Sequence, residues 1–563
     1  MTGAESIVKI LQKYDVTDAF GIPGGVILDF LYALNDSKSI KPHLLYSEQA
    51  AGFAACGYAH RKNNLACAYA TRGPGIANMI TSMAEAYQES LPVLFLTAHA
   101  NCNSDSFRFE FDQELDFSKS VAQFTKCSYF IDNIGELSEK VEMACRSAVS
   151  GRKGPVFIDV SAKLFKDSIT ELPIIVEKTE DDTQYDIIDE FITCLESVLN
   201  NAKRPIFLIG DGIRKSGKKD FLRNYLSKLK VPILSSRGAQ DYMAGGRNYF
   251  GYIGSHGIRY ANYILSKSDL IIALGNRLSF PIQSQSFAPI LQHAKIVRID
   301  IDKNEFFREI PNSLNLCIDV GDFLKYLNKK AFDWNEYLSW ISVCNQIKSI
   351  LCDIDLSLPS KMLTNILNIV KNLDYTYVCD VGNCEFFFSR AFEKCQPKGV
   401  ILYSRSFGTL GSALGKAIGA FYSIKKPVIC VIGDSGFQYS IQELQYLVQW
   451  KIPIKILLMN NSSLGMIKDY EERQGKERLH VSEDSDYTVP DFKKVIESYG
   501  INFISYDDDY VSLKDGLRNP LPCVIELKYG NNIILTPSLP KGNECYDMNP
   551  TLNIQLQKQL ESL

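Results

Sequence analysis

Short apolar runs rich in β-branched residues alternate with longer helical patterns through almost the whole chain of 563 residues. Between these runs lie stretches with helical periodicity, such as 76–89 and 441–450. Strands that alternate with helices indicate βαβ units around buried parallel sheets. About a dozen strands are too many for one compact sheet, so the pattern predicts an α/β fold of three doubly wound parallel-sheet domains. The predicted strands are 65–70, 93–97, 156–160, 206–210, 233–235, 270–274, 297–301, 377–381, 428–433, 454–459 and 524–528.

Two stretches interrupt this alternation and suggest the domain boundaries. Residues 173–186 are acidic with a proline at their start, and residues 325–359 contain no clear strand and are typical of a helical connector. We therefore expect domains at 1–168, 185–328 and 355–535. A C-terminal arm at 536–563, which contains three prolines and one glycine before a helical pattern, should follow them.

Composition excludes several classes of protein. The formal charge is −4, from 61 basic and 65 acidic residues, which argues against a nucleic-acid partner. No run approaches the ~18 apolar residues of a membrane-spanning helix, and the N-terminus lacks the layout of a signal peptide. Fifteen cysteines are scattered through apolar segments without zinc-site spacing. Reduced thiols in a cytoplasmic protein are therefore expected, with no membrane association.

The segment 428–466 carries the most informative pattern of polar residues. One apolar strand runs into Asp434, and the next ends at Asn461. In an open parallel sheet, ligands bind beyond the carboxyl ends of the strands. Carboxylate and amide oxygens suit Mg²⁺, which usually shares them with a phosphate group, and Ser435 and Gly436 would let that phosphate approach a helix N-terminus. Either cluster alone is typical of a helix cap or a turn, but the pair favours a metal–diphosphate site.

Together with several glycine-rich strings, this segment resembles the thiamin diphosphate-dependent enzymes, and in particular their acetolactate (acetohydroxyacid) synthase branch. The resemblance covers the chain from Thr2 to about residue 530. It implies a pyrimidine-binding, a middle and a diphosphate-binding domain, with thiamin diphosphate, Mg²⁺ and FAD as cofactors. It also implies a homodimer or homotetramer. The strings occur in the family's order at 20–25, 47–59, 72–78, 250–263, 274–277, 298–302, 407–411 and 464–466.

The resemblance assigns roles to individual residues. Glu48 follows a short predicted strand at 43–47, and a lone glutamate at a helix start is ordinarily a partner of the helix dipole. It matches the family's glutamate that hydrogen-bonds the pyrimidine ring and promotes deprotonation of the thiazolium carbon, while Leu410 matches the apolar residue beneath the cofactor. Asp434, Asn461 and Ser463 would bind the metal. The other thiamin diphosphate contacts would be Gly24, Gly75, Asn78, Asn383, Cys384, Gly408, Gly433, Ser435, Gly436, Leu464, Gly465 and Met466.

The predicted middle domain resembles the family's flavin-binding domain. Arginines and aspartates around strand ends are common in any αβ crevice, and relatives exist that have the same domain without a flavin. The residues that match flavin-contacting strings are Arg152, His256, Arg277, Asp300 and Asp319.

Several expected substrate positions differ from the acetolactate synthase pattern. Arg72 replaces a serine, His99 replaces a glutamine and Tyr470 replaces a tryptophan. Gln113 matches the family's substrate-side glutamine only if one residue is inserted before it, and Cys384 replaces a histidine near the diphosphate. The residues expected to activate the cofactor are retained, so these changes predict a more polar or larger second substrate.

The leading prediction is decarboxylation of a 2-keto acid, most simply pyruvate, followed by carboligation to a second carbonyl compound. Acetyl transfer to another ketone or aldehyde, such as a nucleotide-linked keto sugar, and simple decarboxylation are alternatives. A non-catalytic, cofactor-binding paralogue is an alternative of another class. The sequence leaves open whether a regulatory subunit binds.

Overall fold

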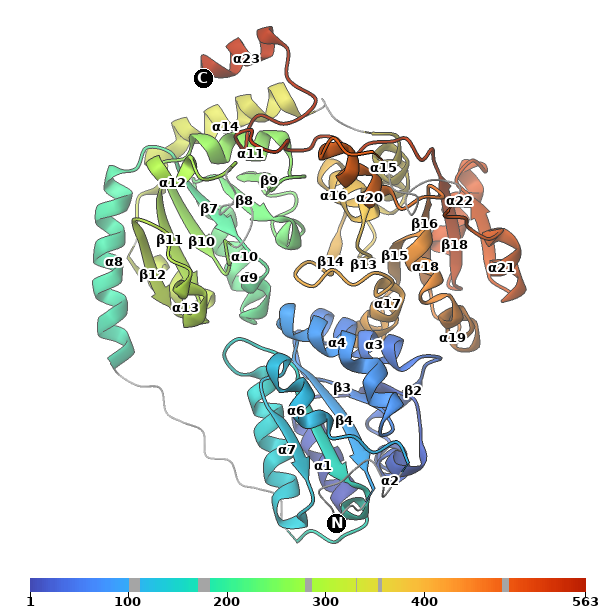
Figure 1. Ribbon diagram of the computed structural model, residues 1–563. Coiled ribbons are helices and arrows are strands. Elements are labelled where there is room, and N and C mark those ends of the chain that lie inside the picture. The colour runs from blue at the N-terminus through green and yellow to red at the C-terminus, as the bar shows by residue number, and fades with distance from the viewer. Residues whose placement is uncertain (101–111, 171–182, 279–285, 331, 353–356, 478–485) are drawn as a thin grey trace.

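Three six-stranded sheets, each with all strands parallel, form the framework of the protein (Figure 1). The computed structural model describes residues 1–100, 112–170, 183–278, 286–330, 332–352, 357–477 and 486–563. Buried parallel sheets need helices on both faces, and the helices between the strands supply them. The predicted fold class, three doubly wound parallel-sheet units, is therefore confirmed.

The first sheet has the strand order β2-β1-β3-β4-β6-β5. Its strands are β1 (Asp18–Gly21), β2 (Lys41–Leu44), β3 (Ala66–Tyr69), β4 (Val93–His99), β5 (Ser128–Ile131) and β6 (Val156–Ser161). Its main helices are α1 (Gly3–Lys13), α2 (Leu28–Ser37), α3 (Glu48–Lys62), α4 (Pro74–Gln88), α6 (Phe117–Val121) and α7 (Ile134–Val149).

The middle sheet has the order β12-β11-β10-β7-β8-β9. When its strands are numbered 1 to 6 along the chain and read from the β9 edge, they follow the 3-2-1-4-5-6 order of a dinucleotide-binding fold. Its strands are β7 (Pro205–Ile209), β8 (Ile233–Ser236), β9 (Tyr249–Ile253), β10 (Leu270–Leu274), β11 (Lys295–Asp300) and β12 (Ser313–Cys317). Its helices are α8 (Thr183–Asn201), α9 (Gly212–Lys215), α10 (Lys219–Lys228), α11 (Arg259–Lys267), α12 (Ile290–His293) and α13 (Val320–Lys329), and α14 (Leu338–Leu351) follows as the expected helical connector.

The third sheet, β14-β13-β15-β16-β18-β17, repeats the strand order of the first. Its strands are β13 (Tyr375–Cys379), β14 (Gly399–Leu402), β15 (Val428–Gly433), β16 (Ile454–Asn460), β17 (Asn502–Ser505) and β18 (Cys523–Lys528). Its helices are α15 (Leu358–Val370), α16 (Asn383–Cys395), α17 (Ala413–Ile424), α18 (Asp434–Gln438), α19 (Leu444–Trp450), α20 (Gly465–Arg473), α21 (Phe492–Ser498) and α22 (Tyr510–Arg518).

All eleven strands listed from the sequence pattern are present, with ends that differ by at most two residues. The predicted strand at 43–47 overlaps β2 but begins two residues later than β2 does. Six strands were missed, namely β1, β5, β9, β12, β14 and β17, and all except β1 lie at the edge of a sheet. The strands β5, β12 and β17 are partly exposed, so they lack the continuous apolar run that marks a central parallel strand, and Gly251 interrupts that run in the buried strand β9.

The first and third sheet units share one hydrophobic core, which includes residues of α3, α4, α17, β13 and β15. Helix α3 packs along α17 through small residues. A Cβ built on Gly419 would lie 1.7 Å from the carbonyl oxygen of Ala54, and one on Gly57 would lie 2.0 Å from that of Lys416. Lys416 of α17 also donates through Nζ to Glu85 Oε1 of α4, and both side chains are buried. The backbones of α3 and α17 are therefore in close contact, with no room for larger side chains at these two glycines.

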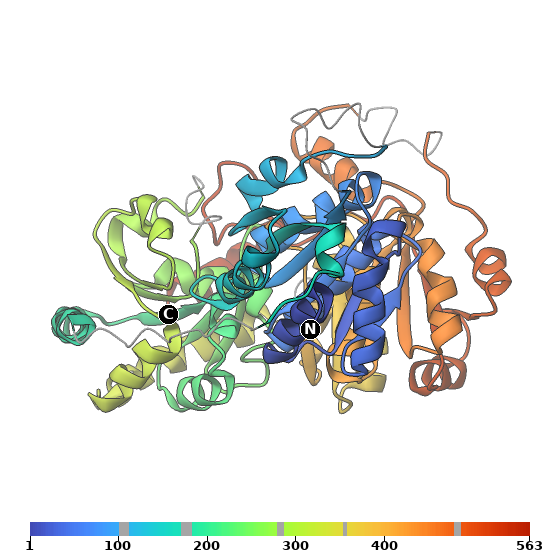
Figure 2. The ribbon, with the colours of Figure 1, turned by 90° about the horizontal axis from the view of Figure 1, so that it is seen from below.

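The three units form a triangle in Figure 1, and Figure 2 shows the first unit between the middle and third units. The C-terminal arm returns from the third unit to the middle one, where Arg259 donates to the carbonyl oxygens of Met548 at 2.7 Å and Pro550 at 2.9 Å. The expected terminal helix is α23 (Ile554–Glu561). In the part of the chain that the structure describes, no helix is both long and apolar enough to cross a membrane.

Candidate active site

Asp434 and Asn461 meet at the carboxyl ends of two neighbouring strands, β15 and β16, as the sequence predicted. The Asp434 carboxylate is buried at the first position of α18. It accepts hydrogen bonds from the backbone N–H of Ser435 at 2.6 Å, Asn461 at 3.1 Å and Ser462 at 2.8 Å, and from the Tyr487 hydroxyl at 3.1 Å. Burial raises the pKa of Asp434, and these donors oppose the shift.

The chemistry around Asp434 fits a magnesium ion and a phosphate group. Ser463 Oγ and Asn383 Oδ1 are buried near this edge of the sheet without a hydrogen-bond partner. A buried polar atom without a partner costs free energy, so such atoms indicate a place for a ligand. Within the described residues, no group of three or more His, Cys, Asp or Glu side chains could hold a metal. One carboxylate supplemented by amide and carbonyl oxygens suits Mg²⁺ better than zinc.

Asn383, Asn461 and Gly465 converge on this site. A Cβ on Gly465 would lie 2.7 Å from Asn461 Nδ2 and 3.2 Å from Asn383 Nδ2, so a larger residue here would push these side chains aside. Asn383 donates to Asp469 at 2.8 Å. Burial raises the pKa of the Cys384 thiol well above its usual range, so Cys384 is a neutral donor toward the Asp380 carbonyl, 3.6 Å away, and cannot serve as a base.

The sequence analysis missed Asp380, which holds the loop that carries Gly408 and Leu410. Its buried carboxylate accepts from Gly411 N at 2.9 Å and from Ala413 N at 3.2 Å, the second at the start of α17. A Cβ on Gly436 would lie 2.1 Å from Asp380 Oδ2, so this carboxylate also touches the turn after Asp434. Burial raises the pKa of Asp380 to about 7. The sequence signal that could have pointed to Asp380 is an acidic residue near the end of the predicted strand 377–381.

The side chain of Glu48 lies at the start of α3, where Ser47 caps the helix by accepting from Ala50 N at 3.0 Å. Asn78 Nδ2 donates to Glu48 Oε2 at 3.1 Å, and a Cβ on Gly75 would lie 3.7 Å from Glu48 Oε1. The fold thus brings together the residues expected on the pyrimidine side. Among the described residues, no hydrogen bond joins this group to Asp434 or Asn461 within one chain.

Of the expected substrate residues, Arg72 and Gln113 lie close together. Arg72 pairs with Glu114 at 2.6 Å, and the same carboxylate accepts from Ala100 N at 2.6 Å. Gln113 has a positive φ of 67°, and a Cβ on Gly73 would lie 2.4 Å from its carbonyl oxygen. Phe111, which precedes this segment in the family's string, lies outside the described residues.

His99 lies at the end of β4 and is buried between two carboxylates. Its Nδ1 is 2.9 Å from Asp159 and its Nε2 is 2.8 Å from Asp132, while the ring stacks on Phe130 with centroids 3.8 Å apart. Burial lowers the pKa of His99, but the two aspartates raise it by more, so the net shift is upward. Both ring nitrogens are engaged, so neither is available to a substrate.

Tyr470 and Met466 of α20 face a cavity of about 1160 Å³ that also contains His256 and, from the C-terminal arm, Lys541. His256 Nε2 accepts from Arg473 at 2.7 Å, and its ring packs on Phe386 with centroids 4.4 Å apart. Burial, followed by the charge of Arg473, lowers the pKa of His256 to about 2. His256 is therefore a neutral acceptor that holds Arg473 in place.

Comparison with known proteins identifies the family. Thiamine pyrophosphate enzyme profiles match residues 1–120 (N-terminal TPP binding domain), 192–327 (central domain) and 380–527 (C-terminal TPP binding domain). A probable acetolactate synthase large subunit of Methanococcus aeolicus is 30% identical over 541 residues, which cover 89% of this chain and 87% of that protein. The chain belongs to the thiamine pyrophosphate enzyme family.

Other relatives place this thiamine pyrophosphate enzyme in the acetolactate synthase-like branch. The acetolactate synthase large subunit of Cyanidium caldarium is 30% identical over 595 residues, covering 100% of this chain and 98% of that protein. That of Lactococcus lactis subsp. lactis is 28% identical over 562 residues, covering 96% and 95%. The family resemblance inferred from the motifs is confirmed, and the protein is an acetolactate synthase-like, thiamine pyrophosphate-dependent enzyme.

The middle domain of this thiamine pyrophosphate enzyme has a cavity of about 530 Å³ beyond strands β7 and β10, where the strand order reverses. Four of the five expected flavin residues line it, namely Arg152, Arg277, Asp300 and Asp319. The fifth, His256, lines an adjacent cavity of about 160 Å³ that shares Ser236, Asn276 and Arg405 with the first. Ligands of dinucleotide-binding folds occupy the crevice at such a switch point.

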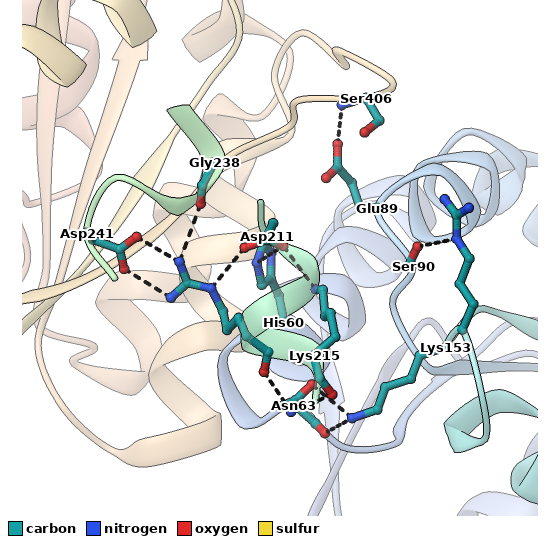
Figure 3. A network of polar contacts seen from close by, with 12 residues as sticks. His60, Asn63, Glu89, Ser90, Lys153, Asp211, Lys215, Gly238, Asp241 and Ser406 are labelled. Carbon is teal, nitrogen blue, oxygen red and sulfur yellow. Dashed lines mark hydrogen bonds and ion pairs between the residues drawn. The ribbon is translucent and has the colours of Figure 1, made fainter. Parts of the chain in front are cut away.

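The 530 Å³ cavity lies where all three units meet (Figure 3). From the first unit, Glu89 accepts from Ser406 N of the third. From the middle unit, Asp211 lies 3.7 Å from His60 Nε2 and 3.5 Å from Lys215 Nζ. Burial lowers the pKa of Lys153, another lining residue, to about 8.

Cationic side chains in a cavity of this size fit the phosphates of a nucleotide. Arg152 is already held by Glu305 at 2.5 Å and Asp302 at 3.2 Å, and Arg277 by Glu305 at 2.9 Å. Both arginines are therefore ion-paired with the Glu305 carboxylate.

Proposed function

We propose that this enzyme uses thiamin diphosphate and Mg²⁺ to decarboxylate a 2-keto acid, pyruvate, and to join the remaining two-carbon unit to a second carbonyl compound. The observation that carries the proposal is the meeting of Asp434 and Asn461 at the carboxyl ends of β15 and β16, beside partnerless Ser463 Oγ and Asn383 Oδ1. This donor set matches an oxygen-bound cation shared with a diphosphate. The acetolactate synthases among the relatives support the same reaction class.

The residues of the chain would divide the work as follows. Asp434, Asn461 and Ser463 would hold Mg²⁺, and Ser435 and Gly436 would bind the diphosphate at the start of α18. Leu410 would support the cofactor from its loop, and Glu48, held by Asn78, would move a proton to and from the pyrimidine ring. Bound thiamin diphosphate supplies the electron sink that decarboxylation needs.

The decisive experiment measures CO₂ release from pyruvate by the protein supplied with thiamin diphosphate and Mg²⁺. We expect release by the wild-type protein and a loss of at least ~100-fold in Glu48→Gln, because the general acid–base group is removed. Gln49→Ala, in the same helical turn, is the matched control and should retain activity. A wild-type protein that binds both cofactors but releases no CO₂ would instead be a non-catalytic paralogue.

For the second substrate, acetolactate formation from two pyruvate molecules is the first candidate. Acetyl transfer to a larger ketone or aldehyde, such as a nucleotide-linked keto sugar, is the second. It is favoured by the cavity of about 1160 Å³ with Tyr470, Arg473 and Lys541 on its walls, since this volume exceeds the ~300–1,000 Å³ of most small-molecule pockets. NMR of the products formed from pyruvate alone and with candidate acceptors separates these two from simple decarboxylation to an aldehyde. Because both nitrogens of His99 are engaged, we assign it to positioning Asp132 and Asp159 and not to substrate binding.

We further propose that FAD occupies the 530 Å³ cavity, with its ring system extending toward His256. Arg152, Arg277, Asp300 and Asp319 would contact its nucleotide portion. The absorbance spectrum of the purified protein tests this. A flavin spectrum supports the assignment, and a colourless protein that still turns over pyruvate removes FAD from the cofactors.

Assembly and location complete the proposal. Among the described residues no hydrogen bond joins Glu48 to Asp434 within one chain, and we propose that the two halves of the site meet across a homodimer or homotetramer. Because relatives are named as large subunits, we propose that a small regulatory subunit also binds. Light scattering of the purified protein tests the oligomeric state, and co-purification tests the binding of a regulatory subunit. Reduced cysteines support a cytoplasmic location. The proposed domain boundaries remain 1–168, 185–328, 355–535 and 536–563.

A further inference from the structure

A buried carboxylate of the third unit holds the turn from which α3 begins. Glu443 ends the short helix η7 (Ile441–Glu443) and is fully buried. Its carboxylate oxygens accept from Tyr46 N at 3.1 and 3.3 Å, and the backbone of Ser47 donates to the same group. These residues are 397 apart in sequence, so only the tertiary structure brings them together.

The turn that Glu443 holds leads directly into Glu48. Tyr46 and Ser47 are the two residues before it, and Ser47 is the cap of α3. The body of α3 cannot slide, because Ala54 and Gly57 are locked against α17. The remaining freedom of the Glu48 side chain lies in its own rotamer, restrained by Asn78, and in the backbone of this first turn.

We propose that Glu443 is a positioning residue for Glu48, which acts by fixing the backbone of the turn that aims the Glu48 carboxylate. The inference rests on the proposed role of Glu48. Glu443 also belongs to the segment that starts at Asp434, since α18 leads through η7 into α19. The segment 434–443 therefore carries the proposed metal ligand Asp434 at its start. At its end it carries Glu443, which holds the turn before Glu48.

The test is Glu443→Gln in the full-length protein supplied with thiamin diphosphate and Mg²⁺. The readout is the rate at which the C2 proton of the bound cofactor exchanges with deuterium, measured by NMR after acid quench. We expect exchange and kcat to fall about tenfold or more, because an error of about 1 Å in the position of a reacting group has effects of this size or larger. The affinity for thiamin diphosphate and the KM for pyruvate should stay within about twofold. Gln445→Ala, exposed on α19 in the same segment, should exchange like the wild type.

Glu443→Asp keeps the charge but shortens the reach by one methylene, and it serves if the glutamine variant does not fold. A folded Glu443→Asp or Glu443→Gln protein that exchanges within twofold of the wild-type rate overturns the inference. An equal loss of cofactor affinity and exchange also overturns it, because that outcome indicates a general structural defect. If the wild-type protein binds no thiamin diphosphate or shows no exchange, the proposed function fails and this inference fails with it.

Discussion

Replacing Lys416 of α17 with methionine removes the only cationic partner that the structure describes for Glu85 of α4. Lys416 and Glu85 are 1% and 0% exposed, and Glu85 Oε2 has no hydrogen-bond partner even in the wild-type protein. Methionine fills a similar volume, so the main cost is a buried carboxyl group without its partner, about 3–5 kcal/mol. At roughly 2–4 °C per kcal/mol, a loss of about 4 kcal/mol lowers the melting temperature by about 8–16 °C.

Differential scanning calorimetry of the full-length protein measures this change. Lys398→Met, at an exposed site of the third unit, is the control and should change stability by less than about 0.5 kcal/mol. In the double variant Glu85→Gln/Lys416→Met the buried charge is gone, so at least half of the lost stability should return. A single variant within about 1 kcal/mol of wild type, or a double variant as unstable as the sum of both single variants, refutes the reasoning.

Three further predictions follow from the described contacts. Asp380→Asn leaves either Gly411 N or Ala413 N without its acceptor. Fluorescence titration should therefore show that thiamin diphosphate binds about tenfold more weakly. An affinity within twofold of the wild-type value contradicts this. Tyr470→Trp narrows the acceptor cavity and should shift the products seen by NMR toward acetolactate; an unchanged product ratio would place Tyr470 outside the pocket. Burial raises the pKa of five carboxyl groups to about 7, so above pH ~4.5 the folded state binds more protons than the unfolded state. The stability that these bound protons contribute is lost as the pH rises through about 7. Urea midpoints should therefore be lower at pH 8 than at pH 5.5, and equal or higher midpoints at pH 8 contradict this; the five residues are Glu89, Asp380, Glu385, Glu393 and Glu443.

Much of the site could be predicted because its parts are local in sequence. Asp434 follows a strand that is apolar throughout, and the glycine strings mark turns where backbone must come close, as Gly436 does against Asp380. The residues expected to contact a flavin were grouped from motifs, and the fold brings four of the five to one cavity while His256 faces the next. That separation depends on how loops of different strands pack, which no local pattern encodes.

The sequence by itself determined the class of the fold, every central strand except β1, and the donor residues of the proposed metal–diphosphate site. Alternating strand and helix patterns and the polar residues at strand ends are short-range signals with direct physical causes. Only the tertiary structure decided which strands form the edges, that His99 is enclosed by Asp132 and Asp159, and that Glu443 holds the turn before Glu48. These features join residues that are far apart along the chain, and their partners are set by the packing of whole helices and sheets against one another.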